Sequence, residues 1–165
     1  TNLKSVTIPE GVTHIGSKVF SRCTSLESIV LPDSVEYVGY GAFMDCTNLI
    51  SADLGGAYEI GMNLFYRCTN LKEVSLPGCL DVLAYGTFGY CSSLEEITLP
   101  NGLSCIDIRA FEYCTSLTTV KMPYDSLESI GDMAFRNCSS LKTITIPYGT
   151  KTIGNKVFFV KYRIK

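Results

Sequence analysis

Residues 69–91 read TNLKEVSLPGCLDVLAYGTFGYC, and this stretch is the middle copy of a motif that occurs seven times in the 165-residue chain. Its landmarks are a leucine near the start, a proline in the centre, and a phenylalanine and a cysteine near the end. Three residue types recur at intervals of 22 to 24 residues: Leu3, Leu26, Leu49, Leu71, Leu94, Leu117 and Leu141; Phe20, Phe43, Phe65, Phe88, Phe111, Phe135 and Phe158; and Cys23, Cys46, Cys68, Cys91, Cys114 and Cys138. Because these three columns share one period, the sequence predicts a tandem array with repeats of about 23 residues.

The array is expected to form a single domain over residues 1–165. Its repeats cover approximately residues 1–23, 24–46, 47–68, 69–91, 92–114, 115–138 and 139–165. Apolar residues make up 46% of the chain and are spread evenly along it, which suits one continuous core. The first residues already follow the repeat pattern, and neither an initiator methionine nor a polar cap precedes them. We therefore interpret it as a fragment, or a mature piece, of a longer protein.

The formal net charge is only −2, and acidic and basic residues are interleaved along the chain. This pattern predicts neither a nucleic-acid partner nor a basic segment for a lipid surface. The uninterrupted apolar runs are a few residues long, whereas a membrane-spanning helix needs about 20. We therefore expect no membrane insertion, while a secretion signal removed before residue 1 is compatible with this start. Nothing in the pattern indicates an oligomeric state.

Each repeat begins with a pattern of period two. In residues 3–9, Val6 and Ile8 alternate with hydroxyl residues, as expected for a short strand with one buried face. The proline that follows lacks the N–H group that a sheet requires, so the strand should end there. Repeat three has Gly55-Gly56 in this place and is one residue shorter, which predicts a tighter turn.

The second half of each repeat spaces apolar residues three apart and then usually places a glycine. This column contains Gly16, Gly39, Gly61, Gly131 and Gly154, with Ala84 and Asp107 as exceptions. A glycine column predicts either a positive φ or close packing at that position. The segment that leads to the cysteine, such as residues 18–23, predicts one short helical or 3₁₀ turn.

With Φ for an apolar residue, the repeated pattern LxxΦxΦPxxΦxxΦGxxAFxxC resembles the BspA-type leucine-rich repeat family over residues 3–158. The departures are Gly55 for proline, Ala84 and Asp107 for glycine, and Lys161 for the seventh cysteine. The resemblance implies an α/β leucine-rich-repeat solenoid, a right-handed curved coil of about seven repeats with a parallel β-sheet on its concave side. It also implies a role in adhesion or recognition, at the cell surface or outside the cell, in bacteria and some parasitic protists.

The eight cysteines raise three alternatives, namely disulfides, a metal site or a nucleophile. Six of them form one column, and side chains stacked in parallel coils point the same way, which is poor geometry for a disulfide. No CxxC motif or Cys/His pair has the spacing of a zinc site. We expect the column to be a buried ladder of reduced thiols. Cys79 and Cys105 lie outside the column, so a bond between these two stays open.

Residues for catalysis are sparse. The single histidine, His14, is expected at the surface, which leaves a serine or cysteine nucleophile without a buried base. Glu73 and Glu96 share a column in neighbouring repeats, with Asp53 nearby, and such carboxylates could share a proton or hold a cation. Stacked surface acids beside lysines are more often a solvated patch. We therefore expect no enzymatic activity, no cofactor and no metal site.

The outward side chains of the strands are mostly small hydroxyl residues, which suit either a generic β-surface or a polar binding surface. Charged side chains on this surface and two rim tyrosines form the candidate binding set: Asp53, Glu73, Glu96, Lys121, Tyr124 and Tyr148. Tyr90 and Tyr113 form a second pair that could serve packing or binding. We predict a module that recognises an extracellular or host protein, or a glycan. The alternative is a structural spacer without a ligand of its own.

Overall fold

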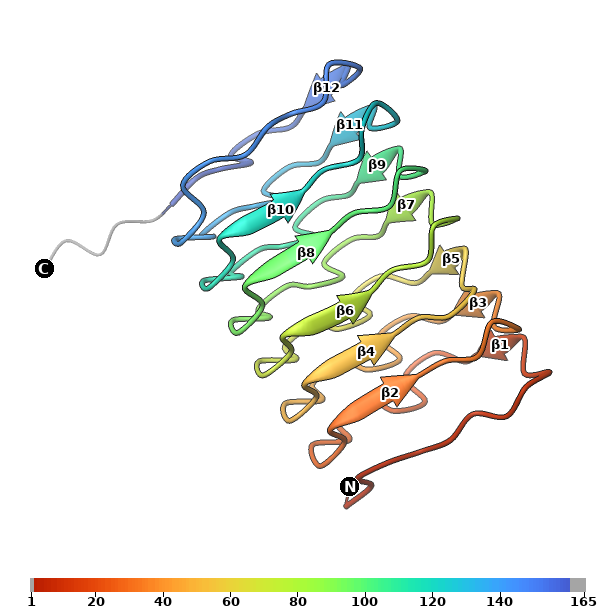
Figure 1. The fold of residues 1–165 in the computed structure, drawn as a ribbon. Helices are drawn as coiled ribbons and strands as arrows, with labels where there is room; N and C mark the ends of the chain where they lie inside the picture. Colours follow the sequence, from red (N-terminus) through yellow and green to blue (C-terminus); the bar gives the residue numbers. More distant parts are fainter. Residues whose placement is uncertain (1, 161–165) are drawn as a thin grey trace, which may run out of the picture.

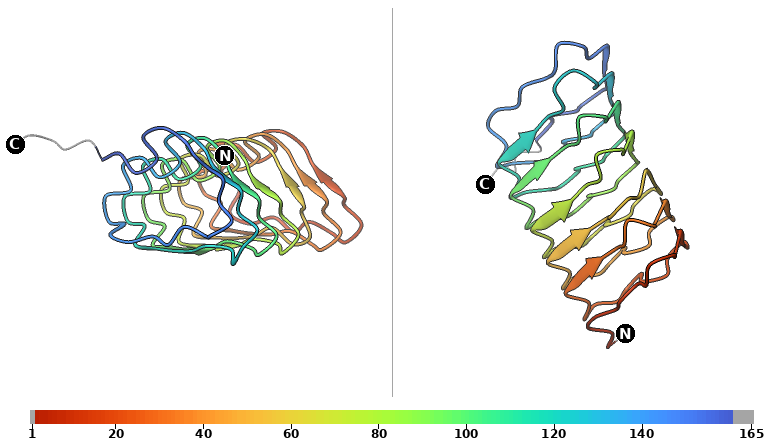
Figure 2. Two further views of the ribbon diagram at one scale, coloured as in Figure 1. Left: turned by 90° about the horizontal axis from the view of Figure 1, so that it is seen from above. Right: turned by 45° about the vertical axis from the view of Figure 1, so that its right-hand side comes forward.

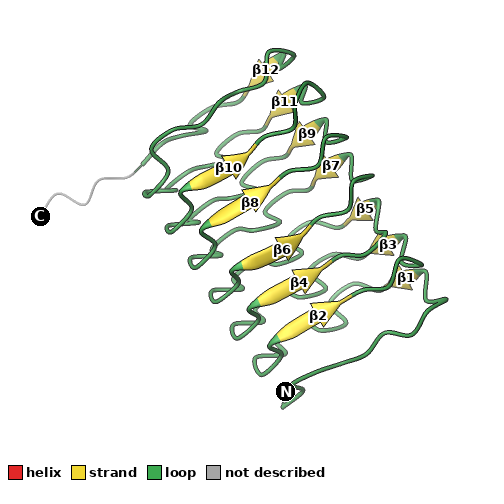
Figure 3. Cartoon of the chain, in the orientation of Figure 1, coloured by secondary structure: helices red, strands yellow, loops and turns green. Residues whose placement is uncertain are grey.

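The computed structural model describes residues 2–160 and shows a β-solenoid of about six turns (Figure 1). Successive coils stack so that equivalent residues of neighbouring repeats lie side by side. The first and the last described repeats therefore lie at opposite ends of the stack (Figure 2). Strands, turns and loops make up the coils, and no helix occurs within the described residues (Figure 3).

Two strand positions recur along the stack, and all pairings between neighbouring strands are parallel. The first position holds three-residue strands, whose outward surface we call the long-strand face: β2 (Ser28–Val30), β4 (Ser51–Asp53), β6 (Glu73–Ser75), β8 (Glu96–Thr98) and β10 (Thr119–Lys121). The second position holds two-residue strands: β1 (His14–Ile15), β3 (Tyr37–Val38), β5 (Glu59–Ile60), β7 (Val82–Leu83), β9 (Cys105–Ile106), β11 (Ser129–Ile130) and β12 (Thr152–Ile153).

The central residue of each three-residue strand points into the core. Ile29, Ala52 and Ile97 are buried, and the centres of β6 and β10 are partly buried against the same core. The prediction of period-two strands is thus confirmed for repeats two to six. The strand expected in residues 3–9 does not form, and neither does its counterpart in residues 142–148. A terminal repeat has a neighbour on one side only, so fewer hydrogen bonds hold such a segment in a ladder.

Each set of strands is interrupted once by a seam, which lies between repeats three and four for the two-residue strands and between repeats four and five for the three-residue strands. The three-residue strands form the sheets β2-β4-β6 and β8-β10, while the two-residue strands form β1-β3-β5 and β7-β9-β11-β12. The seam lies next to the short turn of repeat three, which packs tightly on repeat two. A Cβ atom on Gly55 would lie 2.4 Å from the Leu31 carbonyl oxygen, and one on Gly56 would lie 2.2 Å from that of Asp33.

The segment before each cysteine is an open turn and not a helix, so the predicted helical or 3₁₀ turn is wrong. Lys18 and Arg22 have φ angles of 60° and 61°, which a right-handed helix excludes. The N–H groups alternate between two kinds of acceptor. That of Phe20 donates to the Ala42 carbonyl of the next repeat at 2.9 Å, whereas that of Ser21 donates to Lys18 in its own turn at 3.1 Å. The backbone of this side is therefore satisfied largely by the neighbouring coil, which a helix would not permit.

The glycine column is explained by close packing, because its members lack a positive φ. A Cβ atom on Gly61 would lie 2.4 Å from the Tyr40 backbone nitrogen, and one on Gly131 would lie 2.5 Å from that of Ile108. Alanine stands in this column at position 84, directly after the seam, where β5 and β7 are not paired. Asp107, the other exception, follows β9, which does pair with β7, so the seam alone does not account for both exceptions.

The phenylalanine column forms a continuous stack through the core. Neighbouring rings are nearly parallel, with centroids 5.0–5.7 Å apart from Phe20 to Phe158. The five central rings are fully or almost fully buried: Phe43, Phe65, Phe88, Phe111 and Phe135. This stack crosses the seam without interruption, since the rings of repeats three and four are 5.6 Å apart.

The cysteine column lies beside the phenylalanines as a ladder of buried thiols. All eight cysteines are free, including Cys79 and Cys105, so the bond left open between these two is not formed. Each thiol from repeat two to repeat six donates to the phenylalanine carbonyl of the preceding repeat, at 3.0–3.2 Å. Burial raises the pKa of Cys46 to about 11 and that of Cys138 to about 12. The predicted ladder of reduced thiols is confirmed.

The native protein is expected to protect its column thiols from a disulfide reagent at pH 8, because the reagent cannot reach buried side chains. Cys79, which is exposed, should react at once. Absorbance assays with the reagent should count all eight thiols after unfolding in denaturant without reductant. A count below six under those conditions would show that column cysteines are bonded.

Candidate functional site

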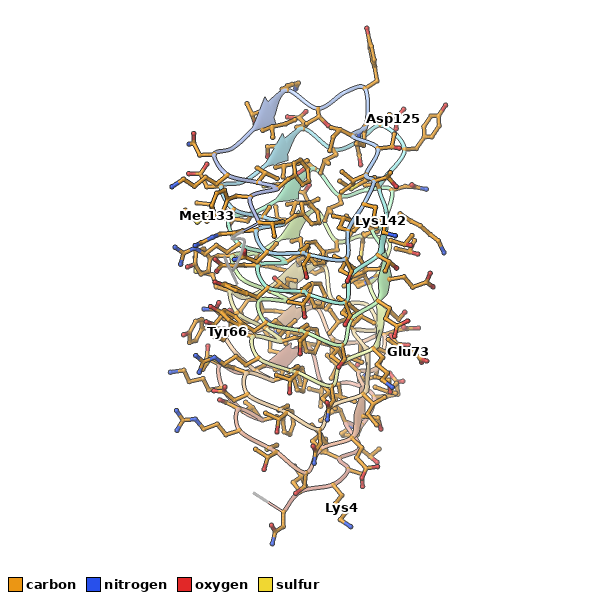
Figure 4. The ribbon with its side chains drawn as sticks, turned by 90° about the vertical axis from the view of Figure 1, so that its left-hand side faces the viewer. Lys4, Tyr66, Glu73, Asp125, Met133 and Lys142 are labelled. Carbon is orange, nitrogen blue, oxygen red and sulfur yellow. The ribbon has the colours of Figure 1, made fainter. Side chains whose placement is uncertain are left out.

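The four charged candidates lie on the long-strand face but in two separate columns. Glu73 and Glu96 occupy the first position of β6 and β8, whereas Asp53 and Lys121 occupy the last position of β4 and β10. In the ladder, Glu73 is opposite Ser51. Figure 4 shows Glu73 on the outer side of this face. The face therefore carries acids near its middle, with hydroxyl residues around them.

The seam separates the two glutamates. Because β6 and β8 belong to different sheets, no ladder fixes the distance between Glu73 and Glu96. Within residues 2–160, neither side chain forms an ion pair, and the same is true of Lys121. Asp53 is partly engaged, since its Oδ1 accepts a hydrogen bond from the Gly55 N–H at 3.0 Å. The three unengaged charges are thus available to a partner.

Tyr124 and Tyr148 stand at the rim of a cleft that sequence reasoning did not find. They follow Pro123 and Pro147, and their side chains are 83% and 105% exposed. A cleft of about 710 Å³ lies between repeats six and seven. Its lining comes from β10, from residues 143–148 and from the loop after β10. The cleft exists because the last repeat does not pair with β10, an end effect that a repeat pattern cannot reveal.

Two side chains of types that often serve in catalysis, His14 and Glu112, lie far apart in the sequence and have contacts of their own. His14 is exposed, and its Nδ1 lies 2.8 Å from the Thr13 hydroxyl oxygen. Glu112 is a buried acid that sequence reasoning overlooked, but Arg136 and Arg109 hold its carboxylate at 3.0 and 3.8 Å. Within residues 2–160, no three His, Cys, Asp or Glu side chains gather as a set that could hold a metal ion. No described helix is long and apolar enough to cross a bilayer.

The parallel strands and the stacked phenylalanines define a repeat protein of the β-solenoid class. A family model, the BspA type leucine rich repeat region with six copies, matches residues 1–83 and 58–165. The chain belongs to this family. No curated protein sequence matches it.

Solved structures of bacterial proteins share the fold. A leucine-rich repeat protein from Bacteroides ovatus is 35% identical, with a TM-score of 0.85, and the match covers 92% of this chain and 39% of that one. A leucine rich cell surface protein from Faecalibacterium prausnitzii is 29% identical, with a TM-score of 0.74 and coverages of 94% and 43%. A leucine rich repeat protein from T. pallidum is 26% identical, with a TM-score of 0.69 and coverages of 86% and 79%. The chain thus spans about two fifths of the first two relatives.

Proposed function

We propose that this chain is a non-catalytic recognition module that binds a protein or a glycan at the cell surface. The observation that carries the proposal is the cleft of about 710 Å³ with two exposed tyrosines at its rim. A large exposed aromatic ring costs solvation free energy unless a partner covers it, and tyrosine is common at binding hot spots. The similarity to a leucine rich cell surface protein of F. prausnitzii supports the location.

The charges of the long-strand face would orient the partner. Glu73 and Glu96 lie on the same face as the cleft, with Lys121 on β10 at the cleft's border. Exposed charges act over about 8 Å at physiological salt, so they steer an approaching partner more than they hold it. We expect weak, salt-sensitive binding that becomes strong when many copies are displayed together.

Replacing Tyr124 and Tyr148 by serine should weaken binding by about tenfold or more, since each ring would be a contact anchor. The melting temperature should stay unchanged, because both side chains are exposed. Surface plasmon resonance against a panel of immobilised glycans and extracellular-matrix proteins would first identify a ligand of the wild type. Tyr58→Ser is the matched control, because Tyr58 is also an exposed tyrosine, 52% exposed, and lies outside the cleft.

The variant with Glu73→Ala and Glu96→Ala tests the steering charges in the same assay. We expect slower association and a weaker salt dependence, without loss of stability. Equal affinity in the tyrosine variant and its control would remove the cleft from the proposal. If the wild type binds no member of the panel, the structural-spacer interpretation is favoured.

A further inference from the structure

A second hollow lies on a different side of the coil and plays no part in the function proposed above. It is a groove of about 320 Å³ whose lining runs from Asp45 of repeat two to Thr115 at the start of repeat six, on either side of the cysteine column. One wall consists of the residues that precede the cysteines, and the other consists of those that follow them. Figure 4 shows Tyr66, whose ring contacts the lining residue Tyr90, on the side of the coil opposite Glu73.

The first wall is aromatic. The Tyr90 and Tyr113 rings stack at 4.6 Å between centroids with 15° between their planes, and the Tyr66 ring meets Tyr90 edge-on at 5.4 Å. Gly89 makes this arrangement feasible, because a Cβ atom there would lie 2.8 Å from the Tyr66 ring. Every other repeat carries a side chain at the Gly89 position, for example Ser21, Tyr66 and Glu112. The tyrosine cluster is therefore particular to repeats three to five and is not a property of every coil.

A cation lies on this aromatic wall. The Arg67 guanidinium carbon is 5.4 Å from the centroid of Tyr66 and 5.8 Å from that of Tyr90. These contacts orient the guanidinium without neutralising it. Within residues 2–160, Arg67 forms no ion pair. Its five N–H donors suit the two oxygens of a carboxylate.

The nearby carboxylates are already occupied by other arginines. Asp45, at one end of the groove, lies 3.8 Å from the Arg22 Nε. Glu112 is held between Arg109 and Arg136. The charge that the groove offers to a ligand is therefore positive, although the chain as a whole has a formal charge of −2. An anion bound here would be recognised by the groove itself and not by the overall charge of the protein.

The second wall supplies hydroxyl groups at the repeat spacing. Thr47, Thr69 and Thr115 line it, and within the described residues their hydroxyls form no hydrogen bond. Ser92 differs, because its hydroxyl donates to the Thr69 carbonyl at 3.3 Å. Neighbouring coils of a parallel β-structure are roughly 4.8 Å apart, so this wall presents a regular row of small polar groups.

We propose that this groove binds an acidic saccharide, a short chain of sugar rings that carry carboxylates. Arg67 would receive a carboxylate, the threonine row would exchange hydrogen bonds with ring hydroxyls, and the tyrosine wall would contact the apolar C–H groups of the sugar. A volume of about 320 Å³ lies at the small end of the range of ligand pockets and suits one or two sugar rings in the groove. The repeated hydroxyls favour a polymer of hydroxylated rings over a peptide.

Two saccharides that differ only in charge test the proposal. Hexagalacturonate carries the carboxylates, and its full methyl ester keeps the rings and hydroxyls but removes the charge. Isothermal titration of the chain should show binding of the acid and binding about tenfold or more weaker for the ester. A phosphotyrosine peptide serves as an anionic probe of another class.

Arg67→Asn should weaken binding of the acid by about tenfold. Lys18→Asn is the matched control, because the Lys18 Nζ also lies over a tyrosine ring, 5.2 Å from that of Tyr40, outside the groove. Both substitutions suit the backbone, since Asn137 and Asn63 occupy the equivalent positions of other repeats with φ angles of 59° and 57°. The control should bind the acid like the wild type.

Three results would overturn the proposal. One is equal affinity for the acid and its ester, which would mean that no carboxylate is recognised. Another is an equal loss in both variants, which would indicate general charge attraction. The third is binding of the phosphotyrosine peptide without binding of hexagalacturonate, which would make the groove a peptide site. None of these results bears on the tyrosine cleft of repeats six and seven, so the two proposals fail independently.

Discussion

Replacing Phe111 by alanine is expected to lower the free energy of unfolding by about 3–5 kcal/mol, the cost of a cavity left by a buried aromatic ring. The side chain is fully buried, and its ring stacks on Phe88 at 5.3 Å and on Phe135 at 5.0 Å. Both neighbouring coils thus lose contacts at once. The Phe111 carbonyl also accepts the Cys138 thiol at 3.1 Å, and a shift of this backbone would disturb that bond as well.

The matched control is Phe158→Ala at the end of the same stack. Phe158 is 44% exposed and has one ring neighbour, Phe135, at 5.7 Å. Removal of the Phe158 ring should lower the free energy of unfolding by about 1 kcal/mol, because folding removes a smaller apolar area of this ring from water. Urea unfolding followed by circular dichroism would measure both values. Equal losses in the two variants would contradict a core whose stability comes from contacts on both sides of each coil.

The features that the sequence predicted are those that recur in every repeat. The period, the buried centre of β2 or β8, and the columns of phenylalanine and cysteine depend on one local pattern, so several copies support each of them. The course of the segment before each cysteine was not predictable in this way. Arg22, Arg67 and Tyr90 all have φ angles near 60°, although none is a residue type that favours such angles. Their backbone N–H groups donate hydrogen bonds to carbonyl oxygens of the next coil, which stabilise this conformation. The sequence of a single repeat does not show these bonds.

The features that the sequence did not reveal arise from differences between repeats. The seam interrupts the pairing of β5 with β7 and of β6 with β8, and neither break is visible in the repeat pattern. The tyrosine cluster beside Arg67 combines two adjacent columns, that of Tyr66 and that of Tyr90. Sequence reasoning paired Tyr90 with Tyr113 because they share a column, and it missed Tyr66, which lies one column away. The signal available in the sequence was Gly89, which stands in the next repeat at the position of Tyr66 and leaves room for the Tyr66 ring.

Alkaline pH is expected to unfold this protein, with a transition between about pH 9 and 11. Burial raises the pKa of Cys46 from 9.0 to about 11 and that of Cys138 to about 12, and it raises those of Cys68, Cys91 and Cys114 in the same direction. The stability from a raised pKa is fully present below the unfolded value and is lost as the pH rises through the folded value. Each such thiol therefore removes about 1.4 kcal/mol per pH unit above pH 9.

Five buried thiols acting together would remove about 7 kcal/mol per pH unit, which soon exceeds the 5–15 kcal/mol that stabilises a typical domain. Urea unfolding at several pH values from 8 to 10, with a phosphine reductant present, would measure this slope.

Replacing Cys91 and Cys114 by alanine should reduce the slope by about 2.7 kcal/mol per pH unit. The cavities that these substitutions leave lower the free energy of unfolding at every pH and do not change the slope. Tyrosine and lysine also titrate near pH 10, but they are common to all variants and cancel in the comparison. Cys79→Ala, which removes an exposed thiol, should keep the wild-type slope. If the double variant keeps it too, the thiol ladder is not the source of the alkaline sensitivity.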